Sequence, residues 1–259
     1  MGQYIPVDSF IHRLDPRTKI IALLAFIPAI FSSSDVYVLM FLPALLFFVA
    51  SLASLSVFFV LRGIRFFFWL LLFTALFHLF FTPGDSFYPF PILGIDMSRQ
   101  GAVTGLRVFL QLFSVIVAAN IFTLTTSPRD MVRGLEQLLS PLKFFGLKTA
   151  EAALMITLVI RFIPVLRDEL LKVMKSQQAR GVVFSEGSLV IRAKNLVAVI
   201  GPVFCRIFDR TETLVLAMTS RAYGSDVERG AYEKKSFKGR DALAFSLVIV
   251  FAYTLFVKY

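Results

Sequence analysis

Hydrophobic positions along this chain fall into long blocks that are separated by short polar segments. A helix needs roughly 20 apolar residues to cross about 30 Å of hydrocarbon, and somewhat shorter stretches are tolerated. Blocks of this kind lie at residues 18–34, 36–61, 64–82, 102–126 and 242–257. The pattern therefore predicts about five transmembrane helices, four of them within residues 1–126 and the last within residues 241–259.

Residues 127–240 follow a different pattern. Apolar residues recur at three- and four-residue steps in residues 149–178 and again in residues 200–218, which predicts two amphipathic helices, the first kinked at Pro164. Ser127 and Pro128 form an N-cap and first-turn pair that begins a third, shorter helix. The most apolar piece, residues 152–160, is too short to span a membrane. The fold class predicted is an all-α membrane protein with a separate domain of two to three amphipathic helices.

Positive charge sets the expected orientation, because loops rich in Lys and Arg stay in the cytoplasm. On one side, the blocks are flanked by the cations Arg13, Arg17, Lys19, Arg62 and Arg65, and the long segment lies on the same side. The other side carries Asp35, Asp85, Asp96 and Arg99. We therefore expect a multi-pass protein whose N-terminus and residues 127–240 are cytoplasmic and whose C-terminus is outside.

Composition excludes several classes of protein. A mean hydropathy of +0.77 and 57% hydrophobic residues indicate an integral membrane protein with the lipid bilayer as its surroundings. The net charge of +10 follows from the cytoplasmic loops, and no nucleic-acid-binding module accompanies it, so nucleic acid is not an expected partner. A single cysteine, Cys205, and two histidines, His12 and His78, cannot build a disulfide framework or a Cys/His zinc site.

The chain also lacks the motifs of an energy source. No Gly-x-x-x-x-Gly-Lys-Ser/Thr loop occurs, the predicted spans hold no buried carboxylate for ion coupling, and no protease constellation is present. We therefore expect no enzyme activity, no catalytic or metal-binding residue and no cofactor in this chain. Arg107, within the fourth block, is an intramembrane charge: it is either a functional residue or one that snorkels toward the outer headgroups.

Two short motifs with a small residue on each side of an arginine are the strongest functional signal. They are Ala179-Arg180-Gly181 and Ser220-Arg221-Ala222, each at the end of a predicted amphipathic helix. One such motif has a structural explanation, since a cation and a glycine both suit a helix C-terminus. The motif recurs, and its small neighbours leave each guanidinium unobstructed. Both features favour two guanidinium groups that bind hydrogen-bond acceptors in a partner.

With these motifs the chain resembles the transmembrane T component of energy-coupling factor transporters, which is related to the T proteins of cobalt and nickel importers. The resemblance covers essentially the whole chain. The residues that carry it are Gly2-Gln3-Tyr4-Ile5-Pro6, His12-Arg13-Leu14-Asp15-Pro16-Arg17-Thr18-Lys19, Gln178-Ala179-Arg180-Gly181, Ile191-Arg192-Ala193-Lys194 and Ala217-Met218-Thr219-Ser220-Arg221-Ala222-Tyr223-Gly224. The sequence departs from the family pattern at Ala222, where glycine is usual.

The resemblance implies a coupling subunit in a bacterial or archaeal inner or plasma membrane. Two cytoplasmic ABC ATPases, commonly a heterodimer, would bind ATP and Mg and receive the coupling helices of residues 127–240, with Arg180 and Arg221 as anchors. A membrane S component would capture a vitamin or metal. The leader is similar to that of T proteins shared among several S components. A stand-alone secondary carrier, a membrane scaffold without transport and an intramembrane enzyme are the alternatives.

Overall fold

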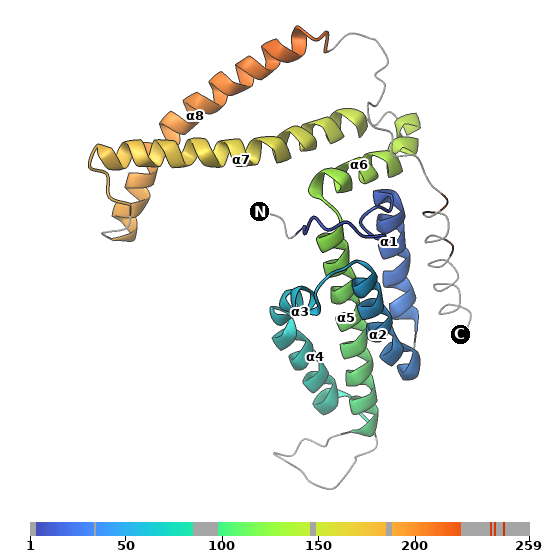
Figure 1. Cartoon of the computed structure of the whole chain (residues 1–259). Coiled ribbons are helices and arrows are strands. Elements are labelled where there is room, and N and C mark those ends of the chain that lie inside the picture. The colour runs from blue at the N-terminus through green and yellow to red at the C-terminus, as the bar shows by residue number, and fades with distance from the viewer. Residues whose placement is uncertain are drawn as a thin grey trace. The chain divides into compact units, whose positions relative to one another are not determined.

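The computed structural model describes residues 4–33, 35–84, 98–145, 149–184 and 188–223, together with residues 239, 241 and 246. The described secondary structure is helical, which confirms the predicted all-α class (Figure 1). The chain divides into two compact units, residues 1–149 with 235–259 and residues 150–234. The predicted functional division at residues 126 and 240 stays a prediction, and the predicted last span at 242–257 lies outside the described residues except for Ser246.

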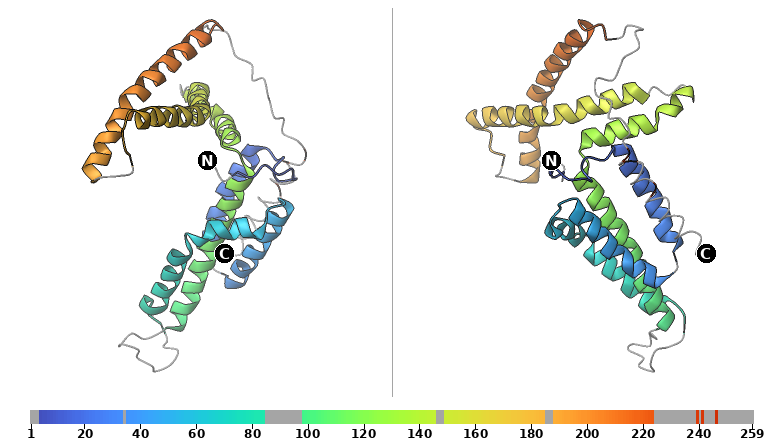
Figure 2. Two further views of the ribbon diagram at one scale, coloured as in Figure 1. Left: turned by 60° about the vertical axis from the view of Figure 1, so that its left-hand side comes forward. Right: turned by 45° about the vertical axis from the view of Figure 1, so that its right-hand side comes forward.

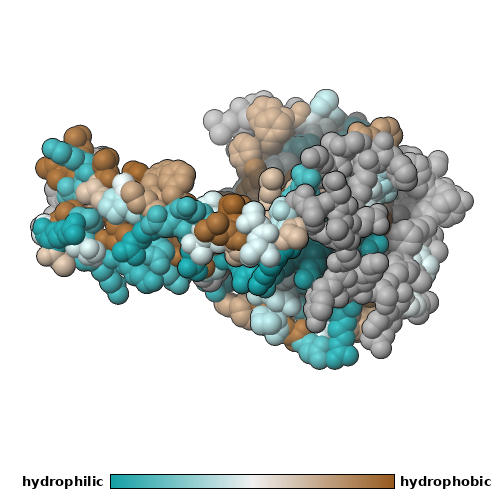
Figure 3. Space-filling view, turned by 90° about the horizontal axis from the view of Figure 1, so that it is seen from above, coloured by the Kyte–Doolittle hydropathy of each residue, from teal (hydrophilic) through white to brown (hydrophobic). Residues whose placement is uncertain are grey.

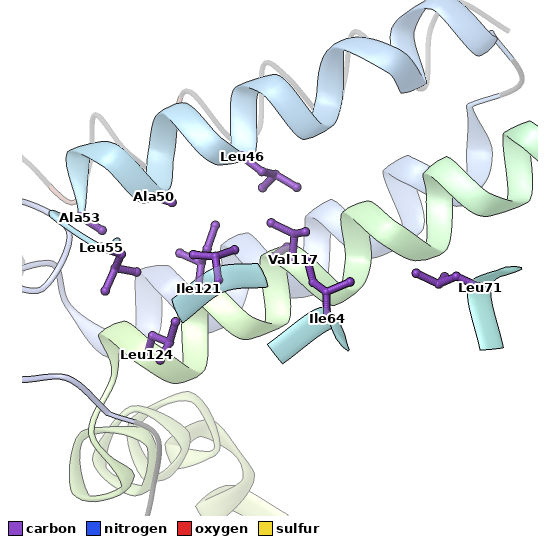
Figure 4. Close-up of a cluster of buried hydrophobic side chains, with 11 residues drawn as sticks. Leu46, Ala50, Ala53, Leu55, Ile64, Leu71, Val117, Ile121 and Leu124 are labelled. Carbon is purple, nitrogen blue, oxygen red and sulfur yellow. The ribbon is translucent and has the colours of Figure 1, made fainter. Parts of the chain in front are cut away.

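In the first unit the long helix α5 (Arg99–Thr125) is the central element, and α1 (Pro16–Ser32), α2 (Val36–Leu52), α3 (Val57–Arg65) and α4 (Phe68–Phe81) all pack against it (Figures 1 and 2). Side chains from α2 and α5, such as Leu46 and Val117, meet in a buried cluster (Figure 4). Its buried members are Leu46, Ala50, Ala53, Leu55, Val60, Ile64, Leu71, Val117, Ala118, Ile121 and Leu124. The core therefore forms where α5 meets its neighbours.

The break between the second and third predicted spans lies at a different position from the predicted one. Ser54 adopts a left-handed conformation (φ +54°), which ends α2, and the side chain of Ser56 accepts a hydrogen bond from the Phe58 amide and begins α3. The predicted boundary between the blocks at residues 36–61 and 64–82 is wrong, because the residues around it are helical and belong to α3. Helices α3 and α4 are bent by 63° at their junction. Hydropathy missed the break since the residues between α2 and α3 are small or apolar.

A polar contact inside the core holds α3 to α5. Asn120 of α5 is buried, and its Nδ2 donates a hydrogen bond of 2.8 Å to the carbonyl oxygen of Val60. Gly63 lies against the Asn120 side chain so closely that a Cβ at that position would clash with the amide group. A glycine is thus required here by the close approach of the two helices.

Length and composition alone qualify α5 and α7 (Thr149–Ala179) as membrane-spanning helices, and the bent pair α3 and α4 as a further span if the two cross together. The apolar segment at residues 152–160 is part of α7, which runs for 31 residues and continues through Pro164. The bounds of α7 agree with the predicted helix at residues 149–178, whereas the expectation that the apolar part is too short to span a membrane is wrong by length and composition. The cytoplasmic location of α7 rests on the distribution of charge and stays a prediction.

The second unit consists of α7 and α8 (Leu189–Thr219), which pack together near the segment that connects them. Val173 of α7 is buried against Val199 and Val203 of α8. Beside this cluster, Arg206 Nη1 donates to Glu169 Oε2 at 2.7 Å, an ion pair between the two helices. Away from it both helices are largely exposed. Hydrophobic and hydrophilic side chains lie side by side in the left-hand part of Figure 3.

Candidate functional site

The C-terminus of α7 carries the first arginine motif in a well-defined cap. The Gly181 amide donates to the carbonyl of Gln178 at 2.9 Å, and the Val182 amide donates to the carbonyl of Gln177 at 3.0 Å. This pair of bonds is the Schellman motif, in which one residue takes a left-handed conformation. Gly181 is that residue, with φ +89°. No neighbouring atom lies within 4 Å of the position of a Cβ, so the backbone conformation and not space favours glycine.

The second motif ends α8 in the same way. The Ala222 amide donates to Thr219 and the Tyr223 amide donates to Met218, both at 2.9 Å. Ala222 has φ +56°, the conformation that Gly181 adopts in the first motif. A residue with a Cβ is disfavoured there by about 1–2 kcal/mol. The cap geometry is therefore retained despite the replacement of glycine, at a conformational cost.

The end of α2 shows what such a cap does when it carries no arginine. The Ser54 amide donates to Ser51 at 2.8 Å and the Leu55 amide donates to Ala50 at 3.0 Å, again with a left-handed residue between. The residue before the left-handed position is Ala53, which is completely buried, and Leu55 after it is buried as well. That cap turns the chain back into the core. At α7 and α8 the corresponding residue is an exposed arginine instead.

Both arginines are available to a partner. Arg180 and Arg221 are exposed, as are Ala179 and Ser220 before them. Among the residues that the structure describes, neither guanidinium makes a hydrogen bond or ion pair, whereas the Ser220 hydroxyl donates to the Ala217 carbonyl at 3.0 Å. A free guanidinium on a rigid cap can form two parallel hydrogen bonds to a carboxylate or donate to backbone carbonyls.

The structure does not bring the two motifs together. Arg180 follows the C-terminus of α7 and Arg221 follows that of α8, and these ends lie apart in all three ribbon views (Figures 1 and 2). Within the second unit the helices meet instead near their connection, through the buried valines and the pair of Glu169 with Arg206. The site therefore consists of two separate contact points on one helical pair.

The N-terminal leader fixes the end of α5 that leads into α6 (Pro128–Leu138). The Ile5 amide donates to the Leu124 carbonyl at 3.1 Å, and Lys19 Nζ donates to the Thr125 carbonyl at 2.9 Å. Arg17 Nε donates to the side-chain oxygen of Gln137 on α6. The N-terminal leader, which carries part of the family resemblance, therefore holds in place the segment that follows α5.

Sequence reasoning missed two residues of this junction, Gly134 and Asp241. Gly134 of α6 is buried against α1, where a Cβ would lie 2.9 Å from Pro16 Cβ and 3.1 Å from Ile20 Cδ1. Asp241 is buried, and its Oδ1 accepts a hydrogen bond of 2.7 Å from the Asp15 amide. A glycine within a helical pattern is a signal for close packing, whereas nothing local to Asp241 pointed to a partner 226 residues away.

His12 is held in its neutral form by the leader. The Ile5 carbonyl accepts from Nε2 at 3.1 Å, so Nε2 carries the proton, and Nδ1 accepts from the Ser9 hydroxyl at 2.7 Å. Burial lowers the pKa of His12 below its ordinary value of 6.5, and the charge of Lys19 adds to this effect. In the same leader, the hydrogen bond from Arg13 lowers the pKa of Asp8. These contacts are structural and place no reactive group at the motifs.

Metal-binding chemistry finds no support in the residues described. No group of three or more His, Cys, Asp or Glu side chains there is arranged to hold a metal ion, and Cys205 is exposed.

Comparison with known proteins supports the family resemblance over nearly the whole chain. The profile of the CbiQ family, described as cobalt transport protein, matches residues 8–232. The chain is 35% identical to a Staphylococcus aureus protein over 99% of this chain and 96% of that protein, and 36% identical to one from Bacillus subtilis with the same coverage. A Brevibacillus brevis protein is 38% identical over 94% of this chain and 91% of its own length. All three are named energy-coupling factor transporter transmembrane protein EcfT. By the extent of these matches, the chain belongs to the CbiQ family and is an EcfT-type transmembrane component of an energy-coupling factor transporter.

Proposed function

We propose that this chain is the coupling subunit of an energy-coupling factor importer of the ABC type. It transmits motion from two cytoplasmic ATPases, which bind ATP and Mg, to a membrane S component that captures a vitamin or metal. The observation that carries this proposal is the pair of identical caps on α7 and α8, each of which presents an exposed arginine, Arg180 or Arg221.

Two separate contact points are better suited than a single binding site to contact with two ATPase subunits or with the two halves of a dimer. Each arginine follows a helix whose cap is fixed by two backbone hydrogen bonds, so little backbone freedom is lost when a partner binds. The ion pair of Glu169 with Arg206 and the buried valines connect the two helices. Movement of one ATPase subunit relative to the other would therefore change the geometry of this helical pair.

A route into the membrane part runs through α6. Gly134 brings α6 into close contact with α1, and Gln137 is bonded to Arg17 near the start of α1. The close backbone approach makes this contact stiff, because interiors packed without voids transmit displacement. We propose that α6 carries motion of the coupling helices to the helices that pack on α5.

An S component would cover the exposed apolar side chains of the coupling helices. The large apolar residues exposed on α7 and α8 are Met155, Ile156, Val159, Ile163, Leu170, Leu171, Val190, Ile191, Leu196, Val197, Ile200, Phe204, Phe208, Val215 and Leu216. So extensive an apolar surface is typical of contact with a membrane-embedded partner or lipid. Substrate specificity would then belong to that partner.

The test is co-purification and uptake with the complete transporter. Arg180→Ala and Arg221→Ala variants are co-expressed with two ABC ATPases and an S component, with Arg210→Ala as control because Arg210 is an exposed arginine in the middle of α8. We expect each motif variant to weaken ATPase association about tenfold, as loss of a charge-assisted hydrogen-bond pair does, and the double variant to abolish uptake. The control should behave as wild type.

Three outcomes would overturn the proposal. Substrate uptake by this chain alone in liposomes under an ion gradient would indicate a secondary carrier. ATPase association that persists in the double variant, with normal uptake, would remove the coupling role of the two arginines. A complex that binds ATPases but never an S component would indicate a scaffold.

A further inference from the structure

A pocket of about 410 Å³ lies on one face of α5, and the coupling function does not account for it. Its described lining consists of Arg99, Gln100, Val103, Thr104 and Arg107. Arg99, Val103 and Arg107 follow one another at steps of four residues, so they form a row along one side of the helix. The pocket thus has a cation at each end of this row and polar side chains beside it.

Arg107 is incompletely satisfied in this position. Its Nε is buried, and among the described residues it has no hydrogen-bond partner. Burying a donor of a charged group without an acceptor is costly, so the position of Arg107 is not explained by the contacts within the chain that the structure describes. By the rise of 1.5 Å per residue, Arg107 lies about 12 Å along the helix from Arg99, within a helix long and apolar enough to cross a membrane.

The opposite face of α5 fixes the direction of this row. A Cβ at Gly101 would lie 2.5 Å from the carbonyl oxygen of His78, and one at Gly105 would lie 2.7 Å from that of Ala75. These glycines let α5 pack directly against the backbone of α4. Gly101 lies two residues from Arg99 and from Val103, and Gly105 lies two residues from Val103 and from Arg107. Two residues correspond to about 200° around the helix, so the row faces away from α4.

We propose that this pocket binds the phosphate group of a phospholipid between Arg99 and Arg107. Guanidinium groups bind phosphate through paired, charge-assisted hydrogen bonds, and the side chains of Arg99 and Arg107 both line this pocket. The exposed side chains of Val103 and Leu106 on the same stretch of helix offer an apolar surface for the acyl chains. A phosphate that carries acyl chains satisfies both features, whereas free phosphate in water satisfies only the first.

The proposal is tested with the purified full chain, reconstituted into vesicles of phosphatidylcholine with or without phosphatidylglycerol. Native mass spectrometry then counts the phospholipids retained by wild type, Arg99→Gln, Arg107→Gln and Arg107→Lys. Arg129→Gln is the matched control, because Arg129 is an exposed arginine on α6 outside the pocket. A parallel titration with inorganic phosphate distinguishes a lipid headgroup from free phosphate.

We expect Arg107→Gln to weaken retention of one phospholipid about tenfold, and Arg107→Lys to restore part of it, since lysine keeps the charge but not the paired geometry. Arg99→Gln should act in the same direction, and Arg129→Gln should have no effect. Equal retention by all variants would overturn the proposal. So would displacement of the lipid by millimolar phosphate. None of these readouts depends on ATPase coupling.

Discussion

Gly181 and Ala222 occupy the same left-handed position in two equivalent helix caps, one residue after Arg180 and Arg221 respectively. The two caps use the same pair of backbone hydrogen bonds, with donor–acceptor distances of 2.9–3.0 Å. The equivalence is therefore one of backbone geometry as well as of sequence. Substitutions at these two positions therefore test how firmly each cap holds its arginine.

Exchanging the two cap residues should have opposite effects. Gly181→Ala places a Cβ in a left-handed residue and is expected to destabilise the end of α7 by about 1 kcal/mol, whereas Ala222→Gly should stabilise the end of α8 by a similar amount. Hydrogen exchange of the Val182 and Tyr223 amides, which close the caps, measures both effects. One kcal/mol corresponds to about a fivefold change in exchange rate. Changes of the same sign in the two variants would contradict equivalent caps.

The contact of Gly63 with Asn120 predicts a strong coupling between two positions. Gly63→Ala should lower stability by about 1–3 kcal/mol, because the new methyl group overlaps the Asn120 amide. Asn120→Ala loses the bond to the Val60 carbonyl, and a loss of about 1–3 kcal/mol is expected. Once the amide is gone the methyl group has room, so the double variant should be close to Asn120→Ala alone. Thermal unfolding in detergent measures the cycle, and simple additivity would argue against the contact.

Asp241 ties the residues near the C-terminal block to the start of α1. Asp241→Ala leaves the buried Asp15 amide without its acceptor, which should cost about 1–3 kcal/mol of stability. Asp241→Asn keeps a side-chain oxygen and should lose much less. The difference in unfolding midpoint between the two variants is the measurement. Equal loss would show that charge and not the hydrogen bond to Asp15 matters.

Acid should loosen the leader through His12. Because burial lowers the pKa of His12 below 6.5, the neutral form stabilises the folded leader at pH values above 6.5, and this contribution is lost as pH falls through the lowered pKa. The protonated ring can no longer accept from the Ser9 hydroxyl. Exchange of the Ile5 amide, corrected for intrinsic rates, should accelerate between pH 7.5 and 5. His12→Gln should remove this pH dependence, and its persistence in that variant would exclude His12 as the cause.

Gly134 provides a test of transmission that leaves the arginines untouched. Gly134→Leu should separate α6 from α1, because the added side chain would overlap Pro16 and Ile20. We expect ATPase co-purification to be retained and uptake to fall several-fold. Glu136→Leu is a control on the same helix. Normal uptake by the Gly134 variant would exclude the α6 contact as the route of coupling.

The first unit shows where sequence patterns were sufficient and where they were not. The starts of α1, α2 and α6 were close to the predicted positions, and Asp15, Asp35 and Ser127 cap them. The break between α2 and α3 was missed although Ser54 and Ser56 are residue types common in turns and at N-caps, because they lie within a long apolar block. The polar caps are local properties, whereas the turn at Ser54 also depends on the burial of Ala53 and Leu55 in the core.

By itself, the sequence determined the helical membrane class, the two arginine motifs and the resemblance to a transporter family. Hydrophobic block length and short motifs are local features, and local features survive without coordinates. Only the tertiary structure decided that Ala222 keeps the cap of Gly181, that Gly63 and Gly134 are sites of close helix approach, and that Arg107 lines a pocket and has an Nε without a hydrogen-bond partner among the described residues. The reason is that each of these depends on backbone dihedral angles or on atoms distant in the chain, which no pattern of residue types specifies.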